Sequence, residues 1–259
     1  MSVSRIPDPA KISIDFLYAV ASGQLDNLSL FQTRGNNPDI DAATSEDIIP
    51  WGGLYAWQSA AVAMEIISTN AADDDPAGTG ARTVLVTGLD ASWNIQTATA
   101  SMNGVAAVAL PGTWRRINQV LVLTVGSSES NVGTISVRVT AGAVIQSQVL
   151  PGEGIDSVGI YTVPNGYSAF VLSYFLEISR AGTGDTLTAS LWRREPTVPG
   201  PRIKSREVTL ATGGTTSFNY ENPVPARIVG PYDLWINGTA GANNTPTGCG
   251  FNLLLESTT

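Results

Sequence analysis

From about residue 48 onward, apolar and polar side chains alternate with a period of two, and this pattern restricts most of the chain to β-strands. Val84 and Val86, for example, alternate with Thr83 and Thr87. Successive side chains of a strand point to opposite faces of a sheet, so the alternation predicts strands with one buried face. Further segments with a strand pattern are 120–125, 135–139, 186–192, 203–210, 215–220, 232–236 and 250–255.

Three Asn-Gly pairs punctuate these segments. Asn103-Gly104 and Asn165-Gly166 each separate two apolar runs, and Asn237-Gly238 follows the segment 232–236. Both residues of such a pair tolerate positive φ, so the pairs predict two-residue hairpin turns. About six or seven strands on either side of residues 150–154, with turns between them, are typical of sandwiches or barrels. We therefore expect an all-β protein with two antiparallel β-sandwich, jelly-roll-like domains over residues 48–152 and 153–259.

The first 47 residues lack the alternation. Asp8 and Pro9 suit the start of a helix and Gly23 suits its end, which predicts a helix over residues 8–23. The alternative is a strand through Ile12, Ile14 and Phe16. Residues 24–47 are polar and have no sustained period, so we expect a long extended arm there. Residues 1–47 would then be a helix and arm outside the two sandwiches.

The residue types that are rare in this chain exclude several classes of function. The net charge is −8, which repels a phosphate backbone and argues against nucleic-acid binding. Histidine is absent, so the common zinc sites, the Ser-His-Asp triad and the Cys-His pair are excluded. Cys249 is the only cysteine, so no internal disulfide forms, and we expect it to be buried as a small apolar residue. We expect no signal peptide, because the N-terminal segment MSVSRIPDPAK has no apolar core, and no membrane span, because no apolar run approaches the ~20 residues that a span needs.

Three consecutive aspartates, Asp73, Asp74 and Asp75, precede Pro76 and a Gly-Thr-Gly. They are weak candidates for a metal site, because consecutive carboxylates cannot all point one way and the alternating spacing of calcium loops is missing. A phosphate loop is disfavoured, since no strand precedes the glycines and the acids would repel the ligand. The interpretation that we favour is a solvated loop that leads into a strand near Ala81.

The sequence gives weaker indications of two other functions, glycoside hydrolysis and carbohydrate binding. A pair of carboxylates could cleave a glycosidic bond, but sequence does not fix the separation of any pair. The candidates are Glu65, Glu153, Glu177, Glu207 and Glu221. Six tryptophans could form a carbohydrate platform, although packing in a core or interface is the more common fate of this side chain. Trp192 shares a predicted strand face with Thr188 and Ser190, so it is the best candidate for an exposed ring.

The segment 120–125 is apolar on both faces. Leu121, Leu123 and Val125 alternate with Val120 and Val122. We expect the first set to face the core, and the face that carries Val120, Val122 and Thr124 to meet a partner sheet or a neighbouring subunit.

Several stretches resemble an uncharacterised family of tailed-bacteriophage virion structural proteins, of a β-sandwich type that decorates the capsid or belongs to the neck or tail. The resemblance covers roughly residues 15–150. It is carried by WGGLY at Trp51–Tyr55, DDDPAGTGARTVLVTGLDASWNIQTATASMNG at Asp73–Gly104, WRRINQVLVLT at Trp114–Thr124 and NVGTISVRV at Asn131–Val139, with DFLYAVASGQL and GNNPDI upstream.

The resemblance implies a structural part of a phage particle that is assembled in the bacterial cytoplasm. Its partners would be the major capsid protein or neck and tail proteins, and copies of itself, with a trimer as the expected oligomer. We expect no enzymatic activity, no cofactor, no nucleic acid and no membrane among its properties. The alternative function is a carbohydrate-binding module of a tail fibre or adhesin that contacts host glycans. If residues 1–47 clasp a neighbour, their removal is expected to leave a folded protein that no longer enters particles.

Overall fold

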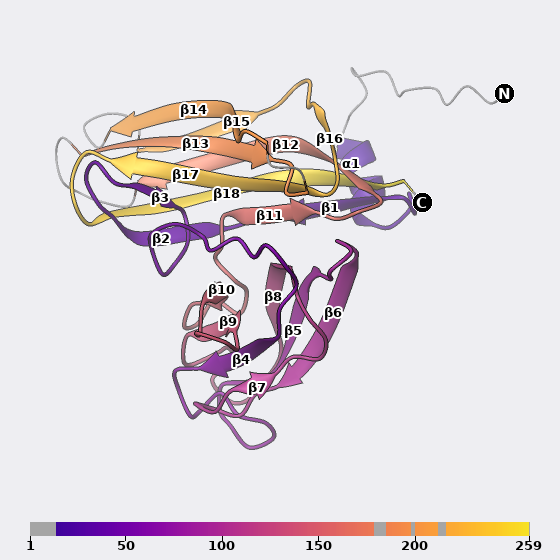
Figure 1. Ribbon diagram of the computed structural model, residues 1–259, viewed down its shortest axis with the longest axis vertical. Coiled ribbons are helices and arrows are strands. Elements are labelled where there is room, and N and C mark those ends of the chain that lie inside the picture. The colour runs from indigo at the N-terminus through magenta and orange to yellow at the C-terminus, as the bar shows by residue number, and fades with distance from the viewer. Residues whose placement is uncertain (1–13, 179–184, 198–199, 212–215, 259) are drawn as a thin grey trace.

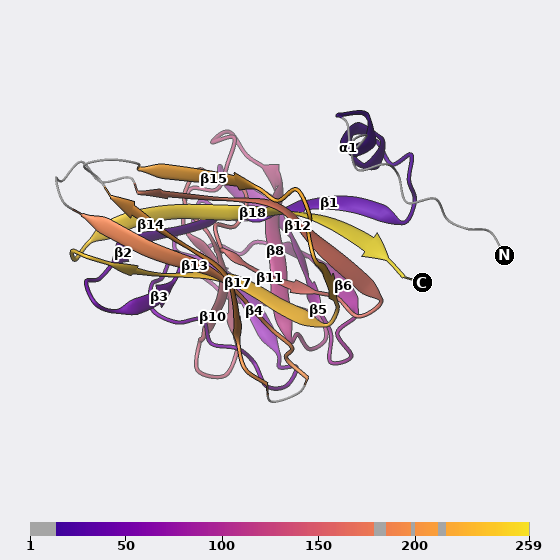
Figure 2. The ribbon, with the colours of Figure 1, turned by 90° about the horizontal axis from the view of Figure 1, so that it is seen from above.

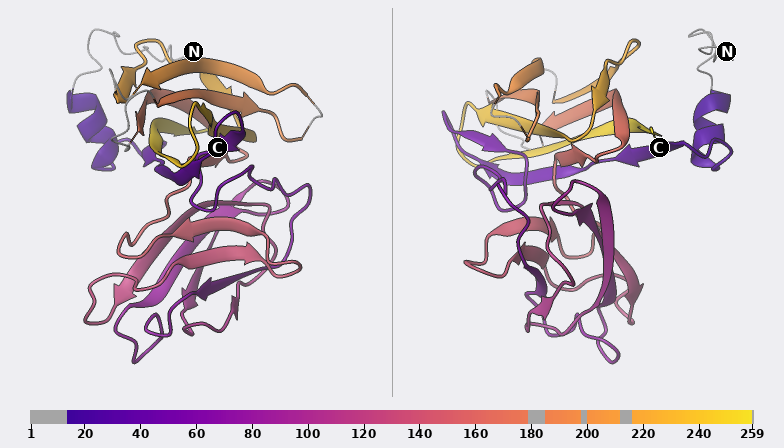
Figure 3. Two further views of the ribbon diagram at one scale, coloured as in Figure 1. Left: turned by 90° about the vertical axis from the view of Figure 1, so that its left-hand side faces the viewer. Right: turned by 45° about the vertical axis from the view of Figure 1, so that its right-hand side comes forward.

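The computed structural model describes residues 14–178, 185–197, 200–211 and 216–258 (Figure 1). These residues form one short helix and eighteen strands, and every ladder between two strands is antiparallel. The all-β prediction is therefore confirmed for the described part of the chain. The strands belong to two units that lie one above the other (Figure 1, Figure 3).

The smaller unit consists of a four-stranded sheet in the order β10-β9-β4-β7 and a three-stranded sheet in the order β6-β5-β8. Met64, Ile66 and Val137 of the first sheet and Val84 and Val86 of the second form one buried cluster. The strands of this unit are β4 (Met64–Ser68), β5 (Ala81–Leu89), β6 (Ile95–Ser101), β7 (Val108–Ala109), β8 (Arg116–Val125), β9 (Ile135–Val139) and β10 (Ile145–Val149).

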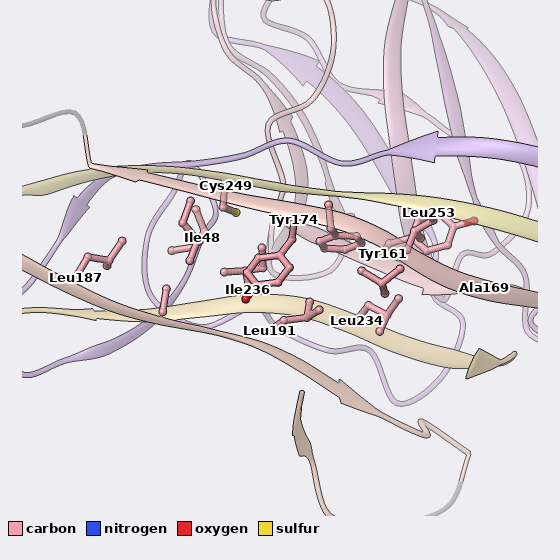
Figure 4. Packing of buried hydrophobic residues seen from close by; sticks show 14 of the residues in the cluster. Ile48, Tyr161, Ala169, Tyr174, Leu187, Leu191, Leu234, Ile236, Cys249 and Leu253 are labelled. Carbon is pink, nitrogen blue, oxygen red and sulfur yellow. The ribbon is translucent and has the colours of Figure 1, made fainter. Parts of the chain in front are cut away.

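The larger unit consists of a six-stranded sheet, in which β1-β18-β12-β15 are joined by β2 and β16, and a five-stranded sheet, in which β11-β17-β13-β14 are joined by β3. Its strands are β1 (Leu28–Gln32), β2 (Gly35–Ile40), β3 (Ser45–Asp47), β11 (Ile160–Val163), β12 (Tyr167–Ile178), β13 (Thr186–Arg194), β14 (Ile203–Ala211), β15 (Ser217–Glu221), β16 (Arg227–Val229), β17 (Tyr232–Ala240) and β18 (Thr245–Ser257). Figure 4 shows Leu191 and Ile236 of the five-stranded sheet packed against Tyr174 and Leu253 of the six-stranded sheet.

The expected arm over residues 24–47 is wrong, because most of it lies inside the sheets of the larger unit. β1 and β2 pair with β18, and β3 pairs with β17. Gly35 packs directly on Cys249, and Asn37 is completely buried. Within the described residues, the chain thus passes first through the larger unit, forms the smaller unit between β3 and β11, and returns to the larger unit. The expected boundary after residue 47 is corrected accordingly.

The helix α1 (Ile14–Ala21) lies beside β1 at the margin of the larger unit (Figure 2). It agrees with the later part of the predicted helix and contradicts a strand through Ile14 and Phe16, while residues 8–13 lie outside the described residues. Gly23 has a φ of 70° and closes the helix with a hydrogen bond from its N–H to the Val20 carbonyl at 3.0 Å. A left-handed glycine in this position is the usual end of a helix.

The Asn-Gly pairs do not form the expected hairpins. Gly104 and Gly166 have positive φ, but each of these turns joins strands that belong to different sheets. Asn237-Gly238 lies within β17, where the Asn237 amide donates to Asp47 Oδ1 at 2.9 Å. The turn residues were identified correctly at two of three positions, but the pairing of the strands is set by the packing of the two sheets.

Candidate functional site

The aspartate run forms a structural anchor. Asp73 is completely buried, and its two carboxylate oxygens accept four hydrogen bonds. Oδ1 accepts from the backbone N–H groups of Ala81 and Val132, each at 2.8 Å. Oδ2 accepts from the Ser68 hydroxyl at 2.6 Å and from the N–H of Gly133 at 2.8 Å. With all four acceptor positions used inside the protein, the Asp73 carboxylate has no free oxygen for a cation.

The Gly-Thr-Gly that follows is explained by the same anchor. A Cβ at Gly80 would overlap Asp73 Oδ1, and a Cβ at Gly78 would overlap the Ala72 carbonyl. Only glycine permits the backbone to approach the Asp73 carboxylate and the Ala72 carbonyl this closely. Asp74 and Asp75 are half-buried beside it, and the described residues contain no group of three or more His, Cys, Asp or Glu side chains arranged to hold a metal ion.

The outward face of the sheet β6-β5-β8 is the opposite of the one expected. Val120 is 1% exposed and Val122 packs on the core of the smaller unit, whereas Leu123 is 47% exposed. The expected partner-binding face of β8 is thus its core face, because Val84 and Val86 of β5 pair with Val122 and Val120 and share their side. Alternation fixed the two sides of this strand, but with both sides apolar it could not tell which side was buried.

Apart from two residues at the strand ends, the outward side chains of this sheet are uncharged; Arg82 at the start of β5 is half-buried, and Arg116 at the start of β8 is buried against Asp233. Register places Leu85 between Thr99 of β6 and Leu121 of β8, and places Thr87 between Thr97 and Gln119. We call this surface the Thr-Leu face. Its members are Thr83, Leu85 and Thr87 of β5, Ile95, Thr97, Thr99 and Ser101 of β6, and Gln119, Leu121, Leu123 and Thr124 of β8; all are exposed or half-buried.

Aromatic rings gather where the smaller unit meets the outer side of the five-stranded sheet. Trp57 packs edge-on against Trp235 at 5.4 Å between ring centroids, and Trp192 stacks on Trp235 at 6.4 Å. The guanidinium of Arg194 lies over the Trp57 ring at 4.4 Å. We call this group the junction cluster; its buried members are Ile49, Tyr55, Val158, Ile160 and Trp235, and Trp51, Trp57 and Trp192 pack against them.

The junction cluster changes the interpretation of Trp192. This residue was the best candidate for a free carbohydrate platform, but its ring stacks on Trp235 and lies under Arg202 at 4.8 Å and Lys204 at 5.1 Å. These contacts occupy ring surface that a sugar would need, so packing is the role that the geometry supports. Trp93 and Trp114 are buried as well.

A buried ion pair holds the two units together at the same place. Asp233 on β17 is completely buried and faces Arg116 on β8. Arg116 donates from Nε to Oδ1 and from Nη2 to Oδ2, each at 3.1 Å. Arg194 and the Thr162 hydroxyl supply two further hydrogen bonds to the carboxylate, at 3.1 and 2.7 Å. Sequence reasoning missed this pair because its members are 117 positions apart and neither stands in a recognisable motif.

Three of the five candidate glycosidase carboxylates are engaged in other contacts, and the other two, Glu177 and Glu221, are exposed on β12 and β15. Glu65 pairs with Arg138, Glu153 accepts from the Ser157 hydroxyl, and Glu207 accepts from Lys204. Each of these contacts has an ordinary structural purpose on a strand or a turn. Cys249 is buried in the core of the larger unit, as its expected role as a small apolar residue requires.

Asp156 lies on the segment that leads from the smaller unit back to the larger one. It lines a cavity of 280 Å³ together with Phe31 and Asn118, and it accepts a hydrogen bond from the Ser147 hydroxyl at 2.8 Å. Desolvation raises the pKa of Asp156 from 3.8 to about 7.

This raised pKa predicts a component of stability that depends on pH. Between pH 4 and pH 7 the folded protein keeps a proton on Asp156 that the unfolded chain has released. The stabilising contribution is therefore complete below about pH 4 and is lost as the pH rises through about 7. We expect the Asp156→Asn variant to gain stability relative to the native protein as the pH rises over this range. Urea unfolding of both proteins at several pH values measures this; a difference that does not change with pH would contradict it.

Comparison with solved structures gives distant neighbours from viruses. No protein-family model matches the sequence, and no curated protein matches it. The chain is similar to infectious bursal disease virus VP2 in a subviral particle, with 11% identity, 95% of this chain and 78% of that chain covered, and a TM-score of 0.25. It is also similar to a chain from a triple jelly-roll turret assembly of an archaeal virus, with 10% identity, 90% of this chain and 60% of that chain covered, and a TM-score of 0.20. Both neighbours come from viral particles. The TM-scores are low, so the function proposed below rests on this chain's own residues.

The described residues include no helix with the length and apolar character needed to cross a membrane.

Proposed function

We propose that this protein is a structural component of a tailed-phage virion, which assembles through protein–protein interfaces as a capsid decoration or cement protein or as part of the neck or tail. The resemblance of residues 15–150 to such proteins motivates the proposal. The proposed role places the protein in the virion beside the major capsid protein or neck and tail proteins, and it needs no catalytic step and no cofactor.

The observation that carries the proposal is the Thr-Leu face. The chain has 22 acidic and 14 basic residues, yet all eleven members of this face are uncharged; the charged residues of the three strands, Arg82 and Arg116, lie at the strand ends. The centres of protein–protein interfaces are depleted of charged side chains in the same way. Rows of threonine and leucine on a rigid sheet can be desolvated against a partner without leaving a buried charge unpaired.

The architecture that goes with this role is also a proposal. We infer that the two units are sandwich domains with jelly-roll-like connections, in which the inner faces of each pair of sheets supply rigidity and an outer face supplies contact. A homotrimer is the proposed oligomer, and multi-angle light scattering of the purified protein tests it. A monomer at all concentrations would contradict this part.

A charge placed on the Thr-Leu face tests the assembly role. Leu123 is 47% exposed, so Leu123→Lys is expected to leave the fold intact and to abolish incorporation into particles. Val144, 38% exposed near the start of β10 and outside the Thr-Leu face, gives the matched control Val144→Lys. Incorporation is measured as the copy number in particles purified from cells that express each variant. Normal incorporation of Leu123→Lys would count against the proposal.

The fold changes the expected result of the N-terminal truncation. Removal of residues 1–47 takes away β1, β2 and β3 and exposes the edge of β18, so we expect this deletion to prevent folding. Removal of residues 1–24 takes away α1, whose Val20 is 3% exposed, and is expected to cost only about 1.5–3 kcal/mol. Circular dichroism melting distinguishes the two; a folded 48–259 fragment would contradict the assignment of the N-terminal strands.

A further inference from the structure

The larger unit contains a cavity of 340 Å³ between its two sheets, at the margin where β14 and β15 end them. Val171, Leu191, Ile228 and Leu234 form an apolar floor that is continuous with the core. The volume falls within the range of small-molecule sites, which is roughly 300–1,000 Å³.

Two arginines line this cavity from the core-facing side of the five-stranded sheet. Arg193 pairs in register with Leu234 of β17, and Arg206 pairs with Leu191 of β13. Residues directly opposite each other in a ladder share a face, and both leucines belong to the core, so both arginines lie on the inner side. Arg206 is exposed at the edge of the sheet, whereas Arg193 is half-buried, and a charged side chain that is partly removed from water in this way normally has a counter-charge.

No such counter-charge is found here. None of the residues that line the cavity is acidic, and within the described ranges neither Arg193 nor Arg206 forms an ion pair. The Nε of Arg193 is shielded from solvent and has no hydrogen-bond partner. Asp233 of the same unit differs, because its carboxylate pairs with Arg194 of the larger unit and Arg116 of the smaller unit; this fold therefore does pair buried charges elsewhere.

Two tyrosines of the opposite sheet complete the site. Tyr174 and Tyr220 are partners in the ladder between β12 and β15, with ring centroids 5.6 Å apart. Arg206 lies over the Tyr220 ring at 3.8 Å. Tyr174 is only 4% exposed and extends between the sheets (Figure 4), yet its hydroxyl has no hydrogen-bond partner. A buried hydroxyl, a buried guanidinium N–H and an apolar floor thus border one space, and native proteins seldom leave such groups unsatisfied.

We propose that this cavity binds a small organic anion that consists of a ring and a carboxylate. The carboxylate is held by Arg193 and Arg206, whose planar guanidinium groups match its two oxygens, and it receives the Tyr174 hydroxyl as a third donor. The ring lies on the apolar floor beside Tyr174 and Tyr220. Aromatic acids and sugar acids share this chemistry.

Calorimetric titration with four probes tests the proposal: benzoate, glucuronate, the neutral benzamide and inorganic phosphate. We expect at least one of the two ring acids to bind with a dissociation constant below about 1 mM, and benzamide to bind at least about tenfold more weakly than benzoate if benzoate is the ligand. The ring acid that binds identifies the source as an aromatic or a sugar acid. Absence of binding by both ring acids at about 10 mM would overturn the proposal, and so would phosphate that binds as tightly as they do.

Substitutions of residues that line the cavity test whether the ring acid binds there. Arg193→Gln is expected to weaken binding of the ring acid at least about tenfold and Tyr174→Phe about three- to tenfold, because each loses a donor to the carboxylate. Arg34→Gln removes the same charge from an exposed arginine that does not line the cavity, and it is expected to leave affinity unchanged. Tyr174→Phe keeps the ring, so it remains informative if Arg193→Gln fails to fold. Native affinity for the ring acid in Tyr174→Phe and in every folded Arg193 variant would contradict its binding in this cavity.

Discussion

Replacement of Asp233 by alanine is expected to destabilise the protein by about 3–5 kcal/mol, the loss that follows when one member of a buried ion pair is removed. The side chain of Arg116 is 3% exposed and that of Asp233 is 0% exposed. Without the carboxylate, the Arg116 guanidinium remains buried with only the carbonyls of Arg115 and Gln58 as acceptors. Since a domain of this kind has a total stability of roughly 5–15 kcal/mol, the loss is a large part of the whole.

The location of this pair gives the variant a second expected property. Arg116 belongs to the smaller unit and Asp233 to the larger, so the contact couples the unfolding of the two. Urea unfolding followed by tryptophan fluorescence is expected to change from one transition in the native protein to two in Asp233→Ala. Trp57 and Trp235 lie at the junction and report on its separation.

The control for this experiment is the pair of Glu65 and Arg138, whose side chains are 15% and 28% exposed. Water screens this pair far more, so Glu65→Gln is expected to cost less than about 1 kcal/mol. The double variant Arg116→Met, Asp233→Leu removes both charges and is expected to recover part of the loss. If Asp233→Ala costs no more than Glu65→Gln, the buried pair is not what joins the units.

The strands could be predicted because their signal is local. Residues 135–139 coincide with β9, and residues 203–210 lie within β14, since alternation along one strand depends only on which face is buried. The same signal was absent from β2, which reads GNNPDI. That strand is held by its ladder with β18 and by polar contacts, such as the Asn37 amide with Glu46 Oε2 at 3.2 Å, so no hydrophobic period marks it.

Contacts between distant segments could not be predicted at all. The junction cluster contains Trp57, which precedes β4, Trp192 of β13 and Trp235 of β17. The local sequence around each tryptophan does not indicate that it contacts the other two. The inner position of Arg193 likewise becomes visible only when β13 is placed in register beside β17. The sequence therefore identifies strands and candidate side chains, while the sites arise from the order of strands in the sheets.

The aspartate run shows which part of a site can be predicted from the sequence and which part only the structure reveals. Sequence favoured a loop over a metal site, and the structure adds that Asp73 organises the loop. We expect Asp73→Asn to destabilise the protein by about 2–4 kcal/mol, because the amide NH₂ would face a backbone N–H where the carboxylate oxygen accepts a hydrogen bond. Four donors from three separate segments depend on this one side chain, including Ala81 at the start of β5.

Asp74 and Asp75 provide matched controls in the same loop. No hydrogen bond within the described residues involves either carboxylate, so Asp74→Asn and Asp75→Asn are expected to change stability by no more than about 0.5 kcal/mol. Thermal melting with and without calcium separates the anchor from a metal site, because an ion held by these acids would raise the melting temperature increasingly as the calcium concentration rises. A calcium-dependent rise that disappears in Asp74→Asn would restore the metal interpretation. A loss confined to Asp73→Asn, with or without the ion, is the result expected of a carboxylate whose acceptor positions are already filled by the chain itself.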